Sequence, residues 1–116
     1  ADGLLFATPT GSTAYSLSAG GPILAPKMEC ILMTPVCPHS LFSRSVLFSG
    51  ESELSVHVKI PEECCCVLTI DGEKNVPILA TDRVVIRKSD LKLKLALLHN
   101  RNFYKLLNEK LKERDF

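Results

Sequence analysis

Hydroxyl-bearing side chains are concentrated near the start of the chain, directly after an apolar stretch. The apolar run from Leu4 to Ala7 is typical of a buried strand, and the Thr8–Gly11 loop that follows contains residues that end regular structure. A glycine pair, Gly20-Gly21, closes the segment. A strand, a tight loop and a short helical turn in this order present backbone N–H groups and small hydroxyls to an anionic or polar ligand. The hydroxyls belong to Thr8, Thr10, Ser12, Thr13, Tyr15, Ser16 and Ser18.

Two interpretations of this hydroxyl-rich segment follow from its residues. Serine and threonine are also common in ordinary connections, where they cap helices by accepting a bond from a backbone N–H. The segment is not a P-loop, because no lysine follows Gly11, and it lacks the G-x-G-x-x-G pattern of dinucleotide-binding folds. A ligand-binding loop and a capped structural connection therefore both stay open.

The same segment resembles the signature of the NAD kinase family. The sequence TPTGSTAYSLSAGGP, from Thr8 to Pro22, matches that signature without interruption, and Asp2-Gly3 precedes it as in the family. Two further blocks are similar to family blocks, namely TPVCPHSL from Thr34 to Leu41, followed by Arg44, and TIDG from Thr69 to Gly72. The resemblance covers the whole chain as the C-terminal part of such an enzyme, and it favours the ligand-binding interpretation.

The resemblance implies a phosphotransferase. NAD kinases transfer a phosphoryl group from ATP, in some members from polyphosphate, to the 2′-hydroxyl of the adenosine ribose of NAD, which gives NADP. This transfer needs a carboxylate as general base, and N–H donors and cations, such as Mg²⁺, around the phosphoryl group. The family's base is the aspartate of a Gly-Gly-Asp-Gly motif and an Asn-Glu pair holds the adenosine, but this chain contains neither motif. The resemblance therefore implies that this chain supplies a substrate-binding wall, with no catalytic residue and no metal ligand, and that an N-terminal α/β domain outside it supplies the rest.

The resemblance also assigns residues to the NAD site. Tyr15 has a ring that can flank the ligand, and Asp2 has a carboxylate that can accept from an amide or a ribose hydroxyl and does not act as the base. Cys37 is expected to shape the pocket. Glu73 stands where the family often has glutamine, and a glutamate accepts hydrogen bonds but cannot donate them. The full set of expected contacts is Asp2, Thr13, Ala14, Tyr15, Ser16, Ser18, Cys37 and Glu73.

The remaining residues that could take part in chemistry, three histidines and an arginine, are interpreted as structural or without function. His39 and Arg44 lie in or beside a proline-rich loop and are expected to stabilise it by hydrogen bonds. His57 and His99 have no partner pattern and are expected to have no function.

The cysteines do not have the spacing of a metal site or a disulfide framework. Cys64, Cys65 and Cys66 are consecutive, so in a strand they point to opposite faces, and Cys30 and Cys37 lack the C-x-x-C spacing. An odd number of cysteines without framework spacing favours a reducing compartment, the cytoplasm. We expect buried, apolar thiols.

Length and composition exclude several classes of protein. The 116 residues suffice for one domain, and the net charge of +1 is unlike the strongly basic footprint of a nucleic-acid-binding domain. No apolar run reaches the roughly 18 residues of a membrane span, and no signal-peptide pattern is present. Because the chain starts at Ala1, directly before a motif and without methionine, we expect it to be a fragment of a longer polypeptide.

The pattern of the chain predicts a mainly β, β-sandwich-like domain. Short stretches of alternating or apolar residues recur at regular intervals, which is typical of a sandwich. Pro35 and Pro38 are expected to end the second strand, and Asp71-Gly72 predicts a tight turn. The expected strands span residues 3–8, 29–34, 45–48, 53–60, 65–71, 76–79, 82–88 and 91–98.

The last residues have a helical pattern. Phe103, Leu106, Leu107 and Leu111 recur at helical spacing, and Asn102 is placed to cap the helix. We therefore expect a β-rich NAD-binding domain over residues 1–100 and an amphipathic helix and tail over residues 101–116. The helix has no helical partner in this chain, so it packs on the sheet or on the missing α/β domain, and the resemblance favours the latter. The resemblance also implies a homodimer or homotetramer.

Two other functions are weighed against the NAD kinase interpretation. The β domain of a lipid or diacylglycerol-type kinase would require a lipid-accepting cleft, and the block from Thr8 to Pro22 speaks against it. A non-enzymatic β-sandwich binding module would show no loss of NAD affinity when Tyr15 is replaced.

Overall fold

Strands dominate the computed structural model, which describes residues 2–38, 43–61, 63–96, 98 and 102–113. The helical elements are the 3₁₀ helix η1 (Thr10–Thr13), the short α1 (Tyr15–Ser18) and the longer α2 (Phe103–Glu113). The expected mainly β class with one long C-terminal helix is thus confirmed. The strands are β1 (Gly3–Ala7), β2 (Cys30–Val36), β3 (Val46–Ser49), β4 (Glu53–Val56), β5 (Cys66–Ile70), β6 (Lys74–Ile78) and β7 (Val84–Arg87).

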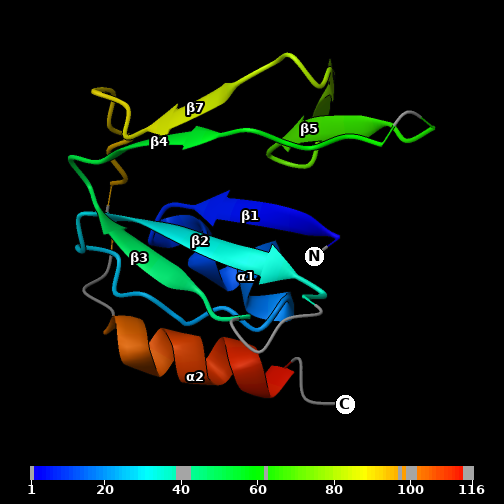
Figure 1. Cartoon of the computed structure of the whole chain (residues 1–116). Helices are drawn as coiled ribbons and strands as arrows, with labels where there is room; N and C mark the ends of the chain where they lie inside the picture. Colours follow the sequence, from blue (N-terminus) through cyan, green and yellow to red (C-terminus); the bar gives the residue numbers. More distant parts are fainter. Residues whose placement is uncertain (1, 39–42, 62, 97, 99–101, 114–116) are drawn as a thin grey trace.

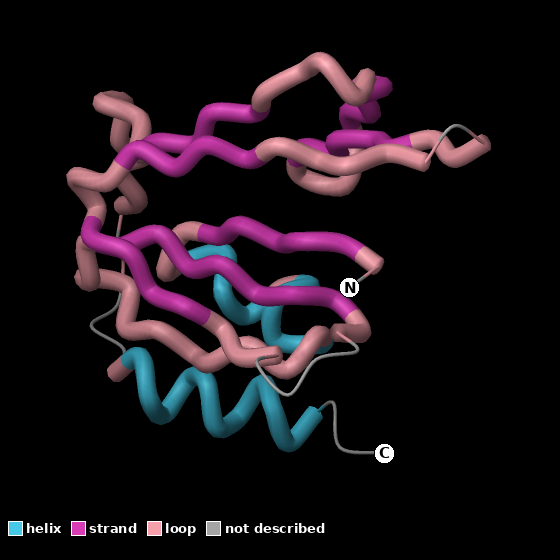
Figure 2. Tube along the Cα trace, viewed as in Figure 1, coloured by secondary structure: helices cyan, strands magenta, loops and turns pink. Residues whose placement is uncertain are grey.

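The described strands form three antiparallel sheets that are arranged in two layers. One sheet has the order β1-β2-β3, while β4 pairs with β7 and β5 pairs with β6. The β4–β7 pair lies above the three-stranded sheet, and the β5–β6 hairpin continues this upper layer at one end (Figure 1). On the other side of the three-stranded sheet lie the short helices η1 and α1, with α2 below them (Figure 2). Layers of β structure in this arrangement make the domain sandwich-like.

The core is centred on β2, the middle strand of the three-stranded sheet. Leu32 on β2 is completely buried, and Ile31 beside it and Leu24 in the preceding loop are 7% and 5% exposed. Leu32 pairs with Leu47 of β3 and with Ala7 of β1, so its side chain lies in the centre of the sheet. The other apolar side chains of the described residues are at least partly exposed. The position of β2 therefore depends on a small number of buried groups.

The second strand is longer than expected. β2 continues through Pro35 to Val36, so the prediction that Pro35 ends the strand is wrong. β3 pairs with β2 only as far as Met33, which leaves one edge of β2 without a paired strand at Pro35 among the described residues. A residue without an N–H is tolerated at such an unpaired edge.

The strand expected over residues 91–98 is absent from its described part, because residues 91–96 and 98 adopt no strand conformation. Leu91, Leu93, Leu95 and Leu98 are 88%, 86%, 73% and 89% exposed. An alternating pattern indicates which side of a strand would be buried, but it forms a strand only where a neighbour supplies the hydrogen bonds. No described strand pairs with this segment, and the prediction is wrong for this reason.

Two local predictions from turn and cap residues are confirmed. Asp71 and Gly72 have φ values of 51° and 71°, and the N–H of Glu73 donates to the carbonyl of Ile70 at 3.1 Å, as in a type I′ hairpin turn. The N–H of Tyr104 donates to Oδ1 of Asn102 at 2.9 Å, which caps α2.

The helix α2 is not held by the core of this chain. None of its described side chains is buried: Phe103, Leu106 and Leu107 of the apolar stripe are half-buried, and Leu111 is exposed. Packing of this helix on another domain stays a prediction. No helix in the described part of the chain is both long enough and apolar enough to cross a membrane.

Replacing Leu32 by alanine is expected to lower the free energy of unfolding by about 2–5 kcal/mol, because a fully buried side chain is lost and a cavity is left. Denaturant titration would measure this as a lower midpoint. The control is Leu98→Ala, at a position that is 89% exposed, where we expect a change within about 0.5 kcal/mol. Equal losses in the two variants would show that the core lies elsewhere.

Candidate functional site

The hydroxyl-rich segment forms a compact bend, which we define as residues 8–21, on one face of the three-stranded sheet. The bend begins where β1 ends, and the N–H of Gly11 donates to Oγ1 of Thr8 at 3.1 Å. Ala14 separates η1 from α1, so the chain changes direction between two helical turns. Gly20, with φ 90°, then ends the helical part.

Two serines four residues apart anchor the inner side of the bend. Ser12 is completely buried, and its hydroxyl donates to the carbonyl of Pro9 at 2.7 Å and accepts from the N–H of Leu24 at 3.1 Å. Ser16 is 4% exposed, and its hydroxyl is hydrogen-bonded to that of Thr34 on β2 at 2.9 Å. Ser12 belongs to η1 and Ser16 to α1, so their separate hydrogen-bond partners, and not a shared helix face, hold both side chains inward.

The residues between and after the two anchors lie on the outer side of the bend. Ala14, Tyr15 and Ser18 are exposed and Thr13 is half-buried. The Tyr15 side chain is 61% exposed, so it contributes little to the core of this chain. The structure thus gathers four expected ligand contacts on one surface element. Ser16 differs from them, because a direct contact with a ligand would compete with its bond to Thr34.

Asp2 and Cys37 lie together at one end of β1 and β2. The N–H of Asp2 donates to the carbonyl of Val36 at 2.9 Å, which places Asp2 next to the residue that follows β2. Both side chains are exposed. Cys37 has a φ of 44°, which is uncommon for a residue other than glycine and marks a sharp change in chain direction.

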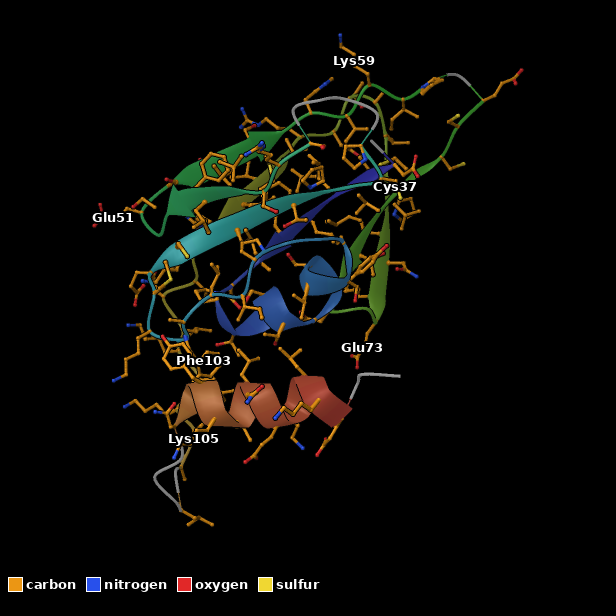
Figure 3. The ribbon with its side chains drawn as sticks, turned by 90° about the horizontal axis from the view of Figure 1, so that it is seen from below. Cys37, Glu51, Lys59, Glu73, Phe103 and Lys105 are labelled. Carbon is orange, nitrogen blue, oxygen red and sulfur yellow. The ribbon has the colours of Figure 1, made fainter. Side chains whose placement is uncertain are left out.

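Glu73 belongs to a third location, the turn between β5 and β6. Its side chain is exposed, and Figure 3 shows it well separated from Cys37. The eight expected contacts therefore fall into three groups: the bend, the adjoining end of β1 and β2, and the hairpin turn. Arg44 is exposed, whereas His39 and His99 lie outside the described residues.

A cleft of about 640 Å³ opens between the layers, at the end of β1 opposite Asp2. It includes Thr8, Pro9 and Thr10 of the bend, but the eight expected contacts do not line it. At its rim Glu29 accepts a hydrogen bond from Lys88. This bond, the charge of Lys88 and the charge of Lys92, whose Nζ lies 3.8 Å away, hold the pKa of Glu29 below its ordinary value. Glu29 consequently stays ionised near neutral pH and is a poor candidate for a proton donor.

The thiols do not match the expectation of burial. All five cysteines are free, and Cys37, Cys64 and Cys65 are exposed, so the prediction of buried thiols is wrong for these three. Cys64 and Cys65 precede a two-stranded hairpin in which no side chain of β5 or β6 is buried, and such a hairpin offers no interior for them. Within the described ranges, no group of three or more His, Cys, Asp or Glu side chains is placed to hold a metal ion.

Sequence reasoning missed the residues that support the bend from inside. Thr34 and Gly21 are both buried against Ser16, and a Cβ added to Gly21 would lie 2.4 Å from Ser16 Oγ and 2.8 Å from Thr34 Oγ1. Gly21 is therefore required by close packing. Ala14 breaks the helical turns between Ser12 and Ser16, and Thr34 lies 18 positions from Ser16, so no short-range pattern identifies this buried group.

Comparison with known proteins is consistent with this architecture. Residues 1–98 match the model of the family described as the ATP-NAD kinase C-terminal domain. The chain belongs to this family, which confirms the resemblance seen in the signature from Thr8 to Pro22.

Relatives and a solved structure support the same assignment. The chain is 46% identical over 113 residues to an NAD kinase of Carboxydothermus hydrogenoformans, covering 97% of this chain and 40% of that protein. It is 47% identical over 111 residues to an NAD kinase of Magnetococcus marinus, with 96% and 36% covered. Its fold is similar to yeast NADH kinase complexed with NADH, with a TM-score of 0.75 and 30% identity over 100% of this chain and 36% of that one. The chain thus spans about two fifths of the length of these relatives.

Gly21→Ala is expected to lower the free energy of unfolding by about 1–3 kcal/mol, because the new methyl group overlaps the Ser16 hydroxyl and carbonyl. The unfolding midpoint measures the loss. Gly3→Ala is the matched control, since its Cβ would meet only Val36 at 3.9 Å, an ordinary contact, and its stability should be unchanged or slightly raised. Wild-type stability in Gly21→Ala would contradict the packing of the bend.

Proposed function

We propose that the complete protein to which this chain contributes a C-terminal domain is an NAD kinase. It transfers a phosphoryl group from ATP to the 2′-hydroxyl of the adenosine ribose of NAD and releases NADP. The observation that carries the proposal is the family match over residues 1–98, which includes the uninterrupted signature from Thr8 to Pro22. Relatives that carry the name NAD kinase match nearly the whole of this chain.

In this proposal the outer side of the bend is a wall of the NAD site. Thr13, Ala14, Tyr15 and Ser18 face the dinucleotide, and their position outside the core supports this role. The Tyr15 ring offers an apolar face with a hydroxyl at its edge, which suits a nicotinamide or adenine ring. The similar yeast enzyme was solved with NADH, which supports a dinucleotide as the ligand.

The other expected contacts contribute from neighbouring elements. Asp2 accepts a hydrogen bond from an amide or a ribose hydroxyl, and Cys37 shapes the same edge of the site. Glu73, on the hairpin turn, acts as an acceptor only. Ser16 holds α1 from the inner side of the bend, since its hydroxyl is already bonded to Thr34.

The proposal assigns the chemical step to the N-terminal α/β domain. A base must take the proton of the 2′-hydroxyl, and positive groups must surround the phosphoryl group during transfer. We assign the base to an aspartate of that domain, together with the binding of ATP and a divalent ion such as Mg²⁺. The described residues of this chain offer no group of ligands that suits such an ion, so none of them is given that role.

The surroundings of the domain are also part of the proposal. The half-buried stripe of α2, formed by Phe103, Leu106 and Leu107, docks on the N-terminal α/β domain, since no described side chain of this helix is buried here. The complete protein forms a homodimer or homotetramer and works in the cytoplasm. Five free cysteines support a reducing compartment.

Tyr15→Ala in the complete protein is expected to raise the Kd for NAD about tenfold, because an exposed aromatic wall of the site is lost. Tyr15→Phe keeps the ring and should stay within about threefold of wild type. Calorimetric titration with NAD measures both values. An unchanged Kd in Tyr15→Ala would favour the non-enzymatic binding module instead.

The 116 residues alone are expected to form no NADP from NAD, ATP and Mg²⁺, whereas the complete protein forms it. The physical reason is that the base and the phosphoryl-binding groups are not on this chain. The measurement is NADP formation by both proteins under the same conditions. Turnover by the fragment on the order of 1–100 s⁻¹, as in ordinary kinases, would refute the division of labour.

A further inference from the structure

Three hydroxyls form a continuous hydrogen-bonded chain on the inner side of the bend. Thr34 stands in the middle, 2.9 Å from the hydroxyl of Ser16 on α1 and 3.0 Å from that of Ser45, which precedes β3. Thr34 is 1% exposed and Ser16 is 4% exposed. A threonine hydroxyl has one hydrogen to donate and can accept as well, so Thr34 satisfies both neighbours.

The short helix α1 depends on this chain of hydroxyls for its orientation. α1 has four residues and no side-chain cap, and a helix of this length is not stable by itself. Its only buried residue is Ser16. The Ser16 hydroxyl is bonded to Thr34, and its carbonyl accepts from the N–H of Gly21 at 2.8 Å. These two bonds connect α1 to the central strand and to the end of the bend.

The exposed residues of α1 move with Ser16. Tyr15 precedes it and Ser18 follows two residues later, so a small rotation of α1 displaces both side chains. The Thr34 backbone, by contrast, pairs with Leu5 of β1 whatever its side chain is. Loss of the Thr34 hydroxyl is therefore expected to loosen α1 while the sheet stays intact.

We propose that Thr34 is a positioning residue of the NAD site, whose hydroxyl holds Ser16 and thereby aims Tyr15 and Ser18 at the dinucleotide. This inference rests on the proposed function, and it adds to the proposed NAD site a residue that lies inside the domain. Thr34 does not touch the substrate, because Ser16 stands between its hydroxyl and the outer side of the bend.

The test compares Thr34→Val with Thr34→Ser in the complete protein. Thr34→Val removes the hydroxyl and leaves that of Ser16 without its buried partner, so the KM for NAD should rise about tenfold, while kcat and the KM for ATP change less than about twofold. A residue that acts only through substrate positioning changes binding in this way. Thr34→Ser restores the hydroxyl and should bring the KM for NAD back to within about threefold of wild type.

A matched control separates this effect from the loss of any side-chain hydroxyl. Ser49→Ala removes an exposed hydroxyl on β3 that accepts from the N–H of Glu51 at 3.3 Å, and it should leave the KM for NAD unchanged. A wild-type KM in Thr34→Val would overturn the inference. A lower kcat at unchanged KM would also overturn it, because that result reports a smaller folded fraction.

Two further measurements keep the inference testable if Thr34→Val does not fold or if the proposed function is wrong. Ser45→Ala removes only the hydrogen bond between Ser45 and Thr34, and the KM for NAD of this variant should rise about threefold. An unchanged KM would overturn the inference. Hydrogen exchange of the amides of residues 13–18 should be faster in Thr34→Val, or in Ser45→Ala, than in wild type. This readout needs no activity, whereas absence of NADP formation by the wild-type complete protein would contradict the proposed function alone.

Discussion

A hydrogen bond between two buried hydroxyls, Ser16 on α1 and Thr34 on β2, joins the proposed ligand surface to the core. A buried hydroxyl without a partner costs about 1–3 kcal/mol, so each of these groups constrains the other. Leu32 and Thr34 are two residues apart on β2, and alternate residues of a strand face the same side. One face of the central strand therefore supplies both the most buried apolar side chain and the attachment of the bend.

The bend divides one hydroxyl-rich segment between a structural inner side and a proposed ligand surface. Its inner hydroxyls, from Ser12 and Ser16, have protein partners, and its outer positions, among them Tyr15 and Ser18, are exposed. The interpretation as a structural connection thus applies to the inner face of these turns, and the outer face is the one that we propose as the ligand surface. A segment of this kind holds its outer face in place without a long helix or strand of its own.

Much of the fold could be predicted where local chemistry decides the conformation. Asp71-Gly72 has the positive φ values that its residue types favour, and Asn102 caps α2 as its position predicts. The predictions were wrong where the conformation depends on a neighbouring strand. Pro35 is accommodated because β3 has already ended its pairing, and the alternating segment from residue 91 to 96 has no strand beside it. The exposure of Cys64 likewise follows from its place beside a hairpin without a buried side chain.

For the site, residue order alone was enough to locate the bend and to recognise the family of the chain. Signature residues are consecutive, and their types constrain a local turn, so this information is carried by the chain itself. Which hydroxyls face inward was decided only by tertiary packing, because Thr34 lies 18 positions from Ser16 and meets it only once β2 pairs with β1. The proposed site is supported by a contact between residues that are far apart in the sequence, and the pattern of neighbouring residues does not predict such a contact.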